Sequence, residues 1–346
     1  MASLKDVTIA VINYNGRGVL ASTLQALRKL CPQSPPVVLV DNGSRDGSPD
    51  WVRHHYPEVE VVLLGTNGTK PSRARNWALK NVHTPYILLL DNDVILEPGC
   101  LEKLLEVMRT RETILACSPR LVTLEDPTVI HFDVGRLHYL CVSGASERGT
   151  SVSRRSTEGT QPTLPGGNAL VNRALARQIG YFDPAYDFGW GDDAEFYIRG
   201  RIAGLDCLHV PAAVAGHPIP RHGTRRAEAQ MHNRYRVLLS IYSARSLLLL
   251  APMLVAFEVA MLVTGLATGL LGAQLRAARR IIKSRKELLR TRNSIQASRR
   301  CRDSAILEGS GISGADILTK RTIVALALRF ADSFFAAYWW AVRRGL

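Results

Sequence analysis

Runs of consecutive apolar residues, each followed by a short polar segment, recur along the first part of the chain. Such runs are typical of strands buried on both faces of a sheet, and they lie at 7–12, 37–40, 59–64 and 86–90. Between them, residues 19–30 and 73–81 carry apolar side chains at helical spacing. Because strands alternate with helices, the pattern predicts an α/β fold with a mostly parallel sheet and right-handed crossovers.

The same alternation continues more irregularly further along the chain. We expect a helix at 101–108, a strand near 114–118, a helix near 173–179 and a short strand at 207–210. Residues 143–163 are rich in Ser, Gly, Thr and Arg, which predicts a mobile loop.

Polar side chains follow the predicted strands. They are Asn13, Asn15, Asp41, Asp91, Asn92 and Asp93. Parallel strands bring their carboxyl ends to one edge, where α/β sheets bind ligands, so we expect these side chains to converge. Two acids one residue apart, such as Asp91 and Asp93, can hold a hard divalent cation that in turn binds a diphosphate. The D-x-D pattern also caps turns, and the D-N-G-S sequence at Asp41 is a good turn, so both interpretations stay open.

A second acidic cluster, Asp192, Asp193 and Glu195, begins a segment with helical spacing. Acids at a helix N-terminus are favourable in any protein, so capping explains one or two of them. The preceding Gly/aromatic loop at 188–191 can bring them close to a ligand, where a carboxylate can act as a general base. His217 follows in an expected turn, and a lone histidine of this kind is also compatible with a structural role.

Two nucleotide-binding fingerprints are missing from the sequence. No G-x-G-x-x-G follows the first strand, and 65–72 lacks the G-x-x-x-x-G-K-[ST] pattern of a P-loop. Lys70 and Arg73 in this region either bind phosphate or are solvated.

The positive charge of the chain is concentrated in its last part. The net charge is +14; residues 1–215 are nearly neutral, whereas 216–346 are strongly basic, which indicates an anionic partner. The six cysteines are scattered without a C-x-x-C pair, which argues against a zinc site and fits a reducing compartment. Residues 1–6 have no apolar core, so no signal peptide is expected.

Two apolar stretches flank a basic one in this last part. Residues 247–273 are long enough to span a bilayer, 276–302 hold many Lys and Arg but only the acid Glu287, and 322–342 form a second apolar stretch. Arg329 and Asp332 form a possible i,i+3 pair within that stretch. The positive-inside rule keeps the basic stretch on the cytosolic side. We therefore expect either a re-entrant hairpin broken near Gly265–Gly272 or helices lying in the membrane plane; the alternative is a soluble helical domain with a solvated basic face.

These motifs, in this order, resemble those of the inverting family-2 glycosyltransferases, which have the GT-A nucleotide-sugar-binding fold. The resemblance covers roughly residues 7–240 and is carried by Asn13-Tyr14-Asn15, Val40-Asp41-Asn42-Gly43-Ser44, Ala74-Arg75-Asn76, Asp91-Asn92-Asp93, Pro165-Gly166-Gly167-Asn168, Gly180-Tyr181-Phe182-Asp183 and Gly191-Asp192-Asp193. The sequence Trp190-Gly191-Asp192-Asp193-Ala194 is similar to that of rhamnosyl- and galactofuranosyltransferase-like members of the family. The implied organisation is a GT-A domain over 1–240 and a helical, membrane-associated region over 241–346.

The resemblance also implies roles for individual residues. Asp193 would be the catalytic base, and Asp93 and His217 would hold Mn²⁺ or Mg²⁺. The residues implied on the donor side are Asn13, Asn15, Asp41, Asn76, Asp91 and Asn92. Those implied on the acceptor side are Gly167, Asn168, Trp190 and Asp192. Asp192 stands where Glu is commoner in the family, and Lys70, Pro71 and Arg73 stand where small residues are usual. Arg221, Arg225 and Arg226 could close over a diphosphate.

The function implied is transfer of a sugar, with inversion, from a UDP- or dTDP-type donor to a hydroxyl of a glycan or polyprenyl-linked acceptor. The expected location is the cytoplasmic face of the cell membrane, in cell-surface polysaccharide synthesis, with an anionic membrane surface and no nucleic acid as a partner. A nucleotidyltransferase that forms sugar nucleotides lacks support, because no Gly-rich basic loop follows the first strand. A non-enzymatic basic module for membrane or nucleic acid leaves the acids unexplained. A processive synthase is disfavoured because Q-x-x-R-W is missing and the tail is short for a channel.

Overall fold

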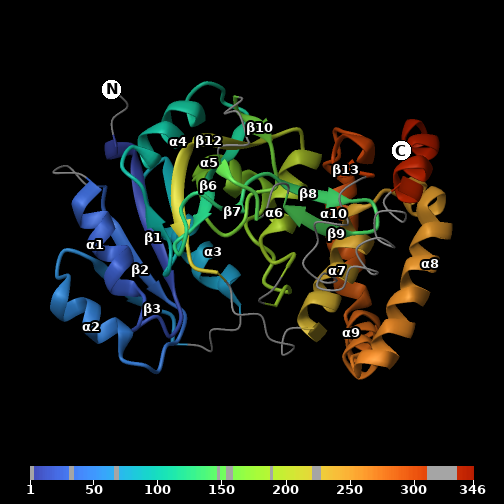
Figure 1. Ribbon diagram of the computed structural model, residues 1–346, viewed down its shortest axis with the longest axis horizontal. Coiled ribbons are helices and arrows are strands. Elements are labelled where there is room, and N and C mark those ends of the chain that lie inside the picture. Colours follow the sequence, from blue (N-terminus) through green and yellow to red (C-terminus); the bar gives the residue numbers. More distant parts are fainter. Residues whose placement is uncertain are drawn as a thin grey trace.

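A ten-stranded sheet runs through one half of the molecule, and a layer of helices lies at the other end (Figure 1). The computed structural model describes residues 4–30, 35–65, 70–145, 149–152, 159–187, 190–219, 227–309 and 333–346. The strands are β1 (Val7–Asn13), β2 (Val37–Asp41), β3 (Glu60–Leu63), β4 (Tyr86–Asp91), β5 (Ile95–Leu96), β6 (Ile114–Thr123), β7 (Ile130–Phe132), β8 (Gly135–His138), β9 (Val142–Ala145), β10 (Gln161–Pro162), β11 (Ala169–Asn172), β12 (Asp206–His217) and β13 (Leu307–Glu308).

The helices alternate with these strands and then form a separate layer. They are α1 (Leu20–Leu30), α2 (Ser48–His55), α3 (Pro71–Asn81), α4 (Cys100–Met108), α5 (Arg173–Ile179), α6 (Ala194–Ile202), α7 (Ala227–Ile241), α8 (Ala244–Thr268), α9 (Leu271–Lys283) and α10 (Arg285–Ala297), and residues 333–342 are also helical.

The main sheet has the strand order β10-β12-β6-β11-β4-β1-β2-β3, with β5 beside β12 and β7 beside β6. β1 pairs in parallel with β2 and β4, and β6 pairs in parallel with β12. β11 runs antiparallel between β4 and β6. The prediction of an α/β fold with a mostly parallel sheet flanked by helices is therefore confirmed.

The sheet is buried on both faces, as its continuous apolar strands predict. Alternate residues point to opposite sides: Val11 and Leu90 pack with α1, α2 and α4, whereas Ala10 and Leu89 pack with α3, α5 and α6. The two-sided burial fixes the register of the central strands, so that Asn13 lies opposite Asp41 at the end of the sheet.

Several observed elements differ from the predictions. α2 was not predicted; it begins at Ser48, and Pro49 in its first turn needs no hydrogen-bonded N–H. β11 was also not predicted and is antiparallel. β12 continues well past 207–210, because a register shift between Val210 and Val214 accommodates Pro211. β9 and β10 lie inside the predicted loop at 143–163, of which 146–148 and 153–158 lie outside the described residues.

α7, α9 and α10 form one packed unit beside the sheet. Gln296 of α10 donates to the carbonyls of Ser240 and Ile241 at the end of α7, and Arg276 of α9 pairs with Glu228 of α7. The predicted boundary between 240 and 241 falls at the end of α7, and the division into domains stays a prediction.

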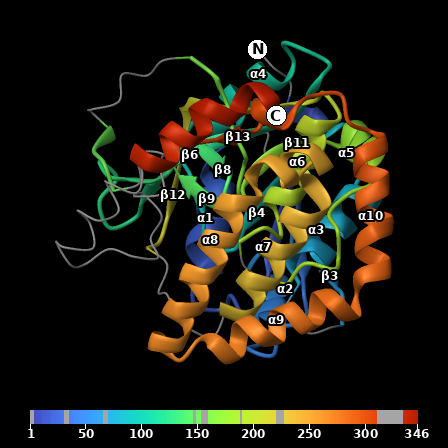
Figure 2. The ribbon, with the colours of Figure 1, turned by 90° about the vertical axis from the view of Figure 1, so that its right-hand side faces the viewer.

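α8 forms the outer edge of the helical layer (Figure 1). It ends at Thr268 and is capped by Gly269, which has a φ of 75°, and α9 follows from Leu271. The chain therefore breaks within Gly265–Gly272, and the choice between a re-entrant hairpin and helices in the membrane plane stays a prediction. α8 is the one helix in the described part of the chain that is long and apolar enough to cross a membrane. Figure 2 shows α8, α9 and the last helix on the face turned toward the viewer. Residues 310–332, with Arg329 and Asp332, lie outside the described residues.

The buried cation Arg236 of α7 gives a test of this packing. Its guanidinium pairs with Asp183 at 3.0 Å and with Glu287 of α10 at 3.3 Å. Arg236→Gln leaves Asp183 without its charge partner, and we expect the free energy of unfolding to fall by about 2 kcal/mol. Arg285→Gln, at an exposed position, should change it by less than about 0.5 kcal/mol. Urea unfolding followed by tryptophan fluorescence measures both, and equal stabilities would contradict the packing role of Arg236.

Candidate active site

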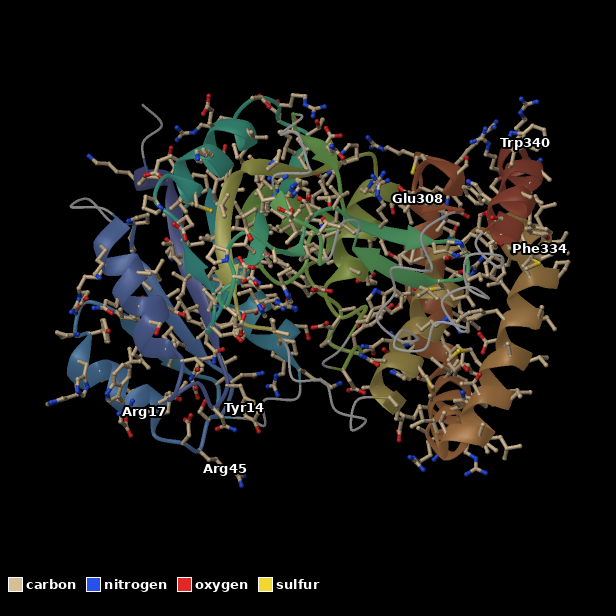
Figure 3. The ribbon with its side chains drawn as sticks, in the orientation of Figure 1. Tyr14, Arg17, Arg45, Glu308, Phe334 and Trp340 are labelled. Carbon is tan, nitrogen blue, oxygen red and sulfur yellow. The ribbon has the colours of Figure 1, made fainter. Side chains whose placement is uncertain are left out.

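The carboxyl ends of β1, β2 and β4 carry most of the predicted donor-side residues to one edge of the sheet. Figure 3 shows Tyr14 and Arg45, which follow β1 and β2, at this lower edge. Asn13 joins the three strands: its Oδ1 accepts from Asn92 at 2.8 Å, and its Nδ2 donates to Asp41 at 2.7 Å. The expected convergence of these polar residues is thus observed.

Asp41 is buried and fully engaged in this network. Its Oδ1 accepts from Asn13 and from the Ser44 hydroxyl, and its Oδ2 accepts from the N–H groups of Gly43 and Ser44. The carboxylate therefore does organise the turn that its D-N-G-S sequence predicts. Its contact with a nucleobase stays a prediction.

Asn15 and Asn76 support loops around the same edge. Asn15 has a φ of 52°, and its side chain accepts from the N–H of Arg45, so it ties the loop after β1 to the loop after β2. Both ends of the Asn76 amide bond the backbone of Phe182, at 2.8 and 2.9 Å. Asn76 thus holds the acceptor-side segment against α3, and its direct contact with a donor stays a prediction.

Asp93 and His217 meet from opposite parts of the sequence. His217 Nε2 lies 3.7 Å from Asp93 Oδ1, because β12 continues to His217, which ends a strand rather than lying in the predicted turn. His217 Nδ1 lies 2.6 Å from the Pro218 carbonyl, which can only accept. In the neutral ring Nδ1 therefore carries the proton, and Nε2 turns its lone pair toward the carboxylate.

A cation fits between these two groups. An imidazole lone pair that faces a carboxylate oxygen needs a positive charge between them, and both are metal ligands. Burial raises the pKa of Asp93, because it penalises the ionised carboxylate, so Asp93 also gains from a cation. The described residues contain no cluster of three or more His, Cys, Asp or Glu side chains suited to a metal. Further ligands would have to come from a substrate and from water.

Asn168, one of the residues predicted on the acceptor side, lies beside Asp91. Asn168 holds this carboxylate, because its Oδ1 accepts from the Asp91 N–H at 2.8 Å and its Nδ2 donates to Asp91 Oδ2 at 3.1 Å. Asp193 caps α6 through the N–H of Ala194, which is the helix-capping role that the sequence allowed. Its Oδ2 also lies close to Gly166.

Trp190 and Gly191 precede the acidic pair. Trp190 packs against the core, and its indole N–H has no hydrogen-bond partner among the residues that the structure describes. Gly191 has a φ of 98° and packs against Asn233 and Val237 of α7. A residue with a side chain would be strained here, so Gly191 sets the path of the chain into Asp192.

Comparison with known proteins gives the family. A family model described as glycosyl transferase family 2 matches residues 8–180, half of the chain. The chain belongs to this family.

Curated relatives agree with this assignment. The chain is 22% identical over 209 residues to the uncharacterized glycosyltransferase YwdF of Bacillus subtilis, covering 59% of this chain and 72% of that protein. It is 24% identical over 250 residues to an N-acetylglucosaminyl-diphospho-decaprenol L-rhamnosyltransferase of Mycobacterium tuberculosis, covering 64% and 78%.

Solved structures share the fold. GalNAc-T7, solved with UDP, GalNAc and Mn²⁺, superposes with a TM-score of 0.57 at 16% identity, over 69% of this chain and 48% of that chain. The mannosyltransferase PcManGT from Pyrobaculum calidifontis, solved with GDP-Man and Mn²⁺, gives a TM-score of 0.50 at 20% identity, over 85% of each chain. The predicted GT-A glycosyltransferase fold is confirmed.

Sequence reasoning missed one central residue of this family-2 site. Arg75 on α3 is buried between the two sides of the site, with Nη1 3.1 Å from Asp192 Oδ2 and Nη2 3.7 Å from Asp91 Oδ1. The Ala74-Arg75-Asn76 motif was the only signal in the sequence. Its partner Asp192 is 117 residues away along the chain, so only the fold reveals the pairing.

The structure describes Lys70 but not the arginines at 221, 225 and 226, which were also considered as phosphate-binding groups. Lys70 donates to the Pro184 carbonyl at 2.9 Å and lies 3.7 Å from Asp187, so it bridges to the acceptor-side segment. Its contact with phosphate stays a prediction. Arg221, Arg225 and Arg226 lie outside the described residues.

Gly167 gives a test of how tightly this site is packed. A Cβ at Gly167 would lie 2.6 Å from Arg75 Nη2 and 2.8 Å from Asp91 Oδ2, so these buried groups would have to move. Because small displacements of site groups are costly, we expect Gly167→Ala to lower kcat/KM by about 100-fold. Gly18→Ala is the matched control, because a Cβ there meets nothing within 4 Å. Steady-state kinetics with equal values for both variants would contradict the packing.

Proposed function

We propose that this family-2 protein is a metal-dependent, inverting and non-processive glycosyltransferase. It moves a sugar from a nucleotide-diphosphate donor to a hydroxyl of a glycan or polyprenyl-linked acceptor, in synthesis of cell-surface polysaccharide. The observation that carries the proposal is the 3.7 Å approach of Asp93, in the turn after β4, and His217, at the end of β12, at the edge that also holds Asp91 and Asp193.

The chemistry follows from the residues at this edge. Mn²⁺ or Mg²⁺ held by Asp93 and His217 would neutralise charge on the diphosphate leaving group. Asp193 is the base: it accepts the proton of the acceptor hydroxyl, whose oxygen attacks the anomeric carbon from the face opposite the leaving group. One displacement of this kind inverts the anomeric centre. Trp190, which comes just before Gly191 and the acidic pair, would offer its aromatic ring to the acceptor sugar.

The donor and acceptor classes rest on the relatives. GalNAc-T7 and PcManGT were solved with UDP and GDP-Man, respectively, both with Mn²⁺, which supports a nucleotide-diphosphate donor. A UDP- or dTDP-type donor is the proposal made from the resemblance of the sequence motifs. The mycobacterial relative is named for a decaprenol diphosphate-linked acceptor, which supports a polyprenyl-linked acceptor. A lipid-linked acceptor requires the enzyme to work at a membrane.

A donor screen tests the proposal. Release of nucleoside diphosphate from a panel of UDP, dTDP and GDP sugars is measured with Mn²⁺, with Mg²⁺ and with EDTA. We expect release from one donor class that depends on the metal. His217→Ala should raise the Mn²⁺ concentration needed for half-maximal release, and release that is insensitive to EDTA would contradict metal dependence.

Asp193→Asn tests the base. Asparagine keeps the size of the side chain but cannot accept the acceptor proton, so we expect transfer to fall by at least about 100-fold, the lower end of the range for general-base catalysis. Donor binding, measured by equilibrium titration with Mn²⁺, should stay within about twofold. The exposed Asp50→Asn is the control for charge, and full turnover by Asp193→Asn would overturn the assignment of the base.

We also propose that α8 attaches the enzyme to the cytoplasmic face of the membrane without crossing it. Apolar side chains are exposed along α8: Leu248, Val255, Val259, Leu262, Val263 and Leu266. Phe334 and Trp340 on the last helix lie along the same outer edge (Figure 3). Exposed basic residues of α9 and α10 add attraction to anionic lipid: Arg279, Lys283, Arg285, Lys286 and Arg290.

Packing within the helical layer supports attachment rather than crossing. α9 pairs with Glu228 of α7, and Arg292 of α10 donates to the Leu239 carbonyl at the end of α7. The segments before and after α8 therefore lie on one side of it, in agreement with the expectation that the basic stretch stays cytosolic.

Vesicle flotation tests this attachment. Replacing Leu248, Val255, Val263 and Leu266 by Ser removes apolar area worth about 1 kcal/mol each, so binding to phosphatidylglycerol vesicles should fall by more than about 100-fold. Replacing the exposed Val19 and Leu63, which lie on the sheet half, should leave binding unchanged. Equal flotation of both variants would contradict attachment through α8.

A further inference from the structure

Arg75 contacts a carboxylate on each side of the site. Its guanidinium reaches Asp91 at the end of β4 and Asp192 just before α6. It also lies over the ring of Phe182, whose backbone is held by the neighbouring Asn76. One turn of α3 therefore organises both the donor side and the acceptor side.

The charges in this cluster do not balance without Arg75. Asp91, Asp192 and Asp193 lie close together, and burial penalises the ionised form of a carboxylate. Burial raises the pKa values of Asp192 and Asp193, and Arg75 lowers both. Arg75 itself stays charged, because Asp192 and Asp91 raise its pKa despite burial, which would lower it.

The shape of the site specifies arginine at this position. A guanidinium has several N–H donors in a planar fork and can bind two carboxylates that lie in different directions, whereas an ammonium is a point charge. Gly167 leaves the space that Nη2 occupies, because any Cβ there would lie 2.6 Å from it. The absence of a side chain at Gly167 thus makes room for the guanidinium of Arg75.

We propose that Arg75 is a positioning residue that holds Asp91 and Asp192 together and thereby sets the place and the charge of Asp193. The proposal rests on the proposed function, in which Asp193 is the base. Arg75 acts through these carboxylates and does not take part in proton transfer. Since it holds one carboxylate from each side, it also keeps the base at a fixed place relative to the donor-side edge.

The groups around Asp193 decide the sign of the pH effect. The charged or titratable groups that act on it come from three elements: Arg75 of α3, Asp91 at the end of β4, and Tyr197 of α6, with Asp192 next to it in sequence. Of these, Arg75 is the cation. Without Arg75 the pKa of Asp193 rises, so the base stays protonated up to a higher pH than in the wild type. The acid limb of the pH–activity profile should therefore move to higher pH.

The test compares the pH profiles of kcat/KM for the wild type, Arg75→Lys and Arg75→Met. We expect the acid limb to move upward by about one pH unit or more in Arg75→Met, the effect of losing one nearby opposite charge. Arg75→Lys keeps the charge but not the fork, so its acid limb should stay within about half a pH unit while kcat falls at every pH. Arg53→Met, at an exposed position of α2, should match the wild type in both respects.

The possible outcomes separate the two proposals. A loss in Arg75→Met by the same factor at every pH, with the acid limb unmoved, would overturn the role of Arg75 and leave Asp193 as the base. Full turnover by Asp193→Asn would instead overturn the proposed function. If Arg75→Met does not fold, Arg75→Gln takes its place, because it removes the positive charge but keeps hydrogen-bond donors for the carboxylates, and its acid limb should also lie above that of the wild type. An unmoved limb in that variant would also overturn the role of Arg75.

Discussion

Gathering several carboxylates at one sheet edge is the constraint on which the rest of the structure depends. Like charges that are taken out of water repel one another and lose hydration, so each needs a cation or several hydrogen-bond donors. The protein meets this need at three of these acids, because Asp41 has four donors around it and Asp91 and Asp192 share Arg75. Asp93 instead faces the lone pair of His217, which does not offset its charge.

The acids differ in how much of their charge the protein itself offsets. Asp41 is fully hydrogen-bonded, and it holds the loop after β2 against Asn13 at the end of β1. Asp93 is left to gain from an external cation, which is the property that a metal-binding carboxylate needs. The family-2 assignment rests on the sequence and the fold, and the chemistry of the site rests on its own residues.

Most of the central sheet could be predicted from the sequence, because its strands are continuous apolar runs that stop at polar residues. The convergence of Asn13, Asp41 and Asp91 follows from parallel pairing alone. The elements that escaped prediction depend on tertiary neighbours. β11 has four residues and gains its strand structure by pairing on both sides, and β12 continues past Pro211 because of a local register shift. Arg75 escaped for the same reason, since nothing near it in sequence reveals its partners.

The helical layer holds Asp187, in the segment before Asp192 and Asp193, and this has a practical consequence. Asn233 of α7 bonds both the N–H and the carbonyl of Asp187, and Arg280 of α9 pairs with the Asp187 carboxylate. An expression fragment that ends near residue 240 would lose α9 and with it the ion pair between Arg280 and Asp187. The segment that leads into Asp192 and Asp193 would then be held less firmly, so the whole chain is the better starting point for a well-ordered preparation.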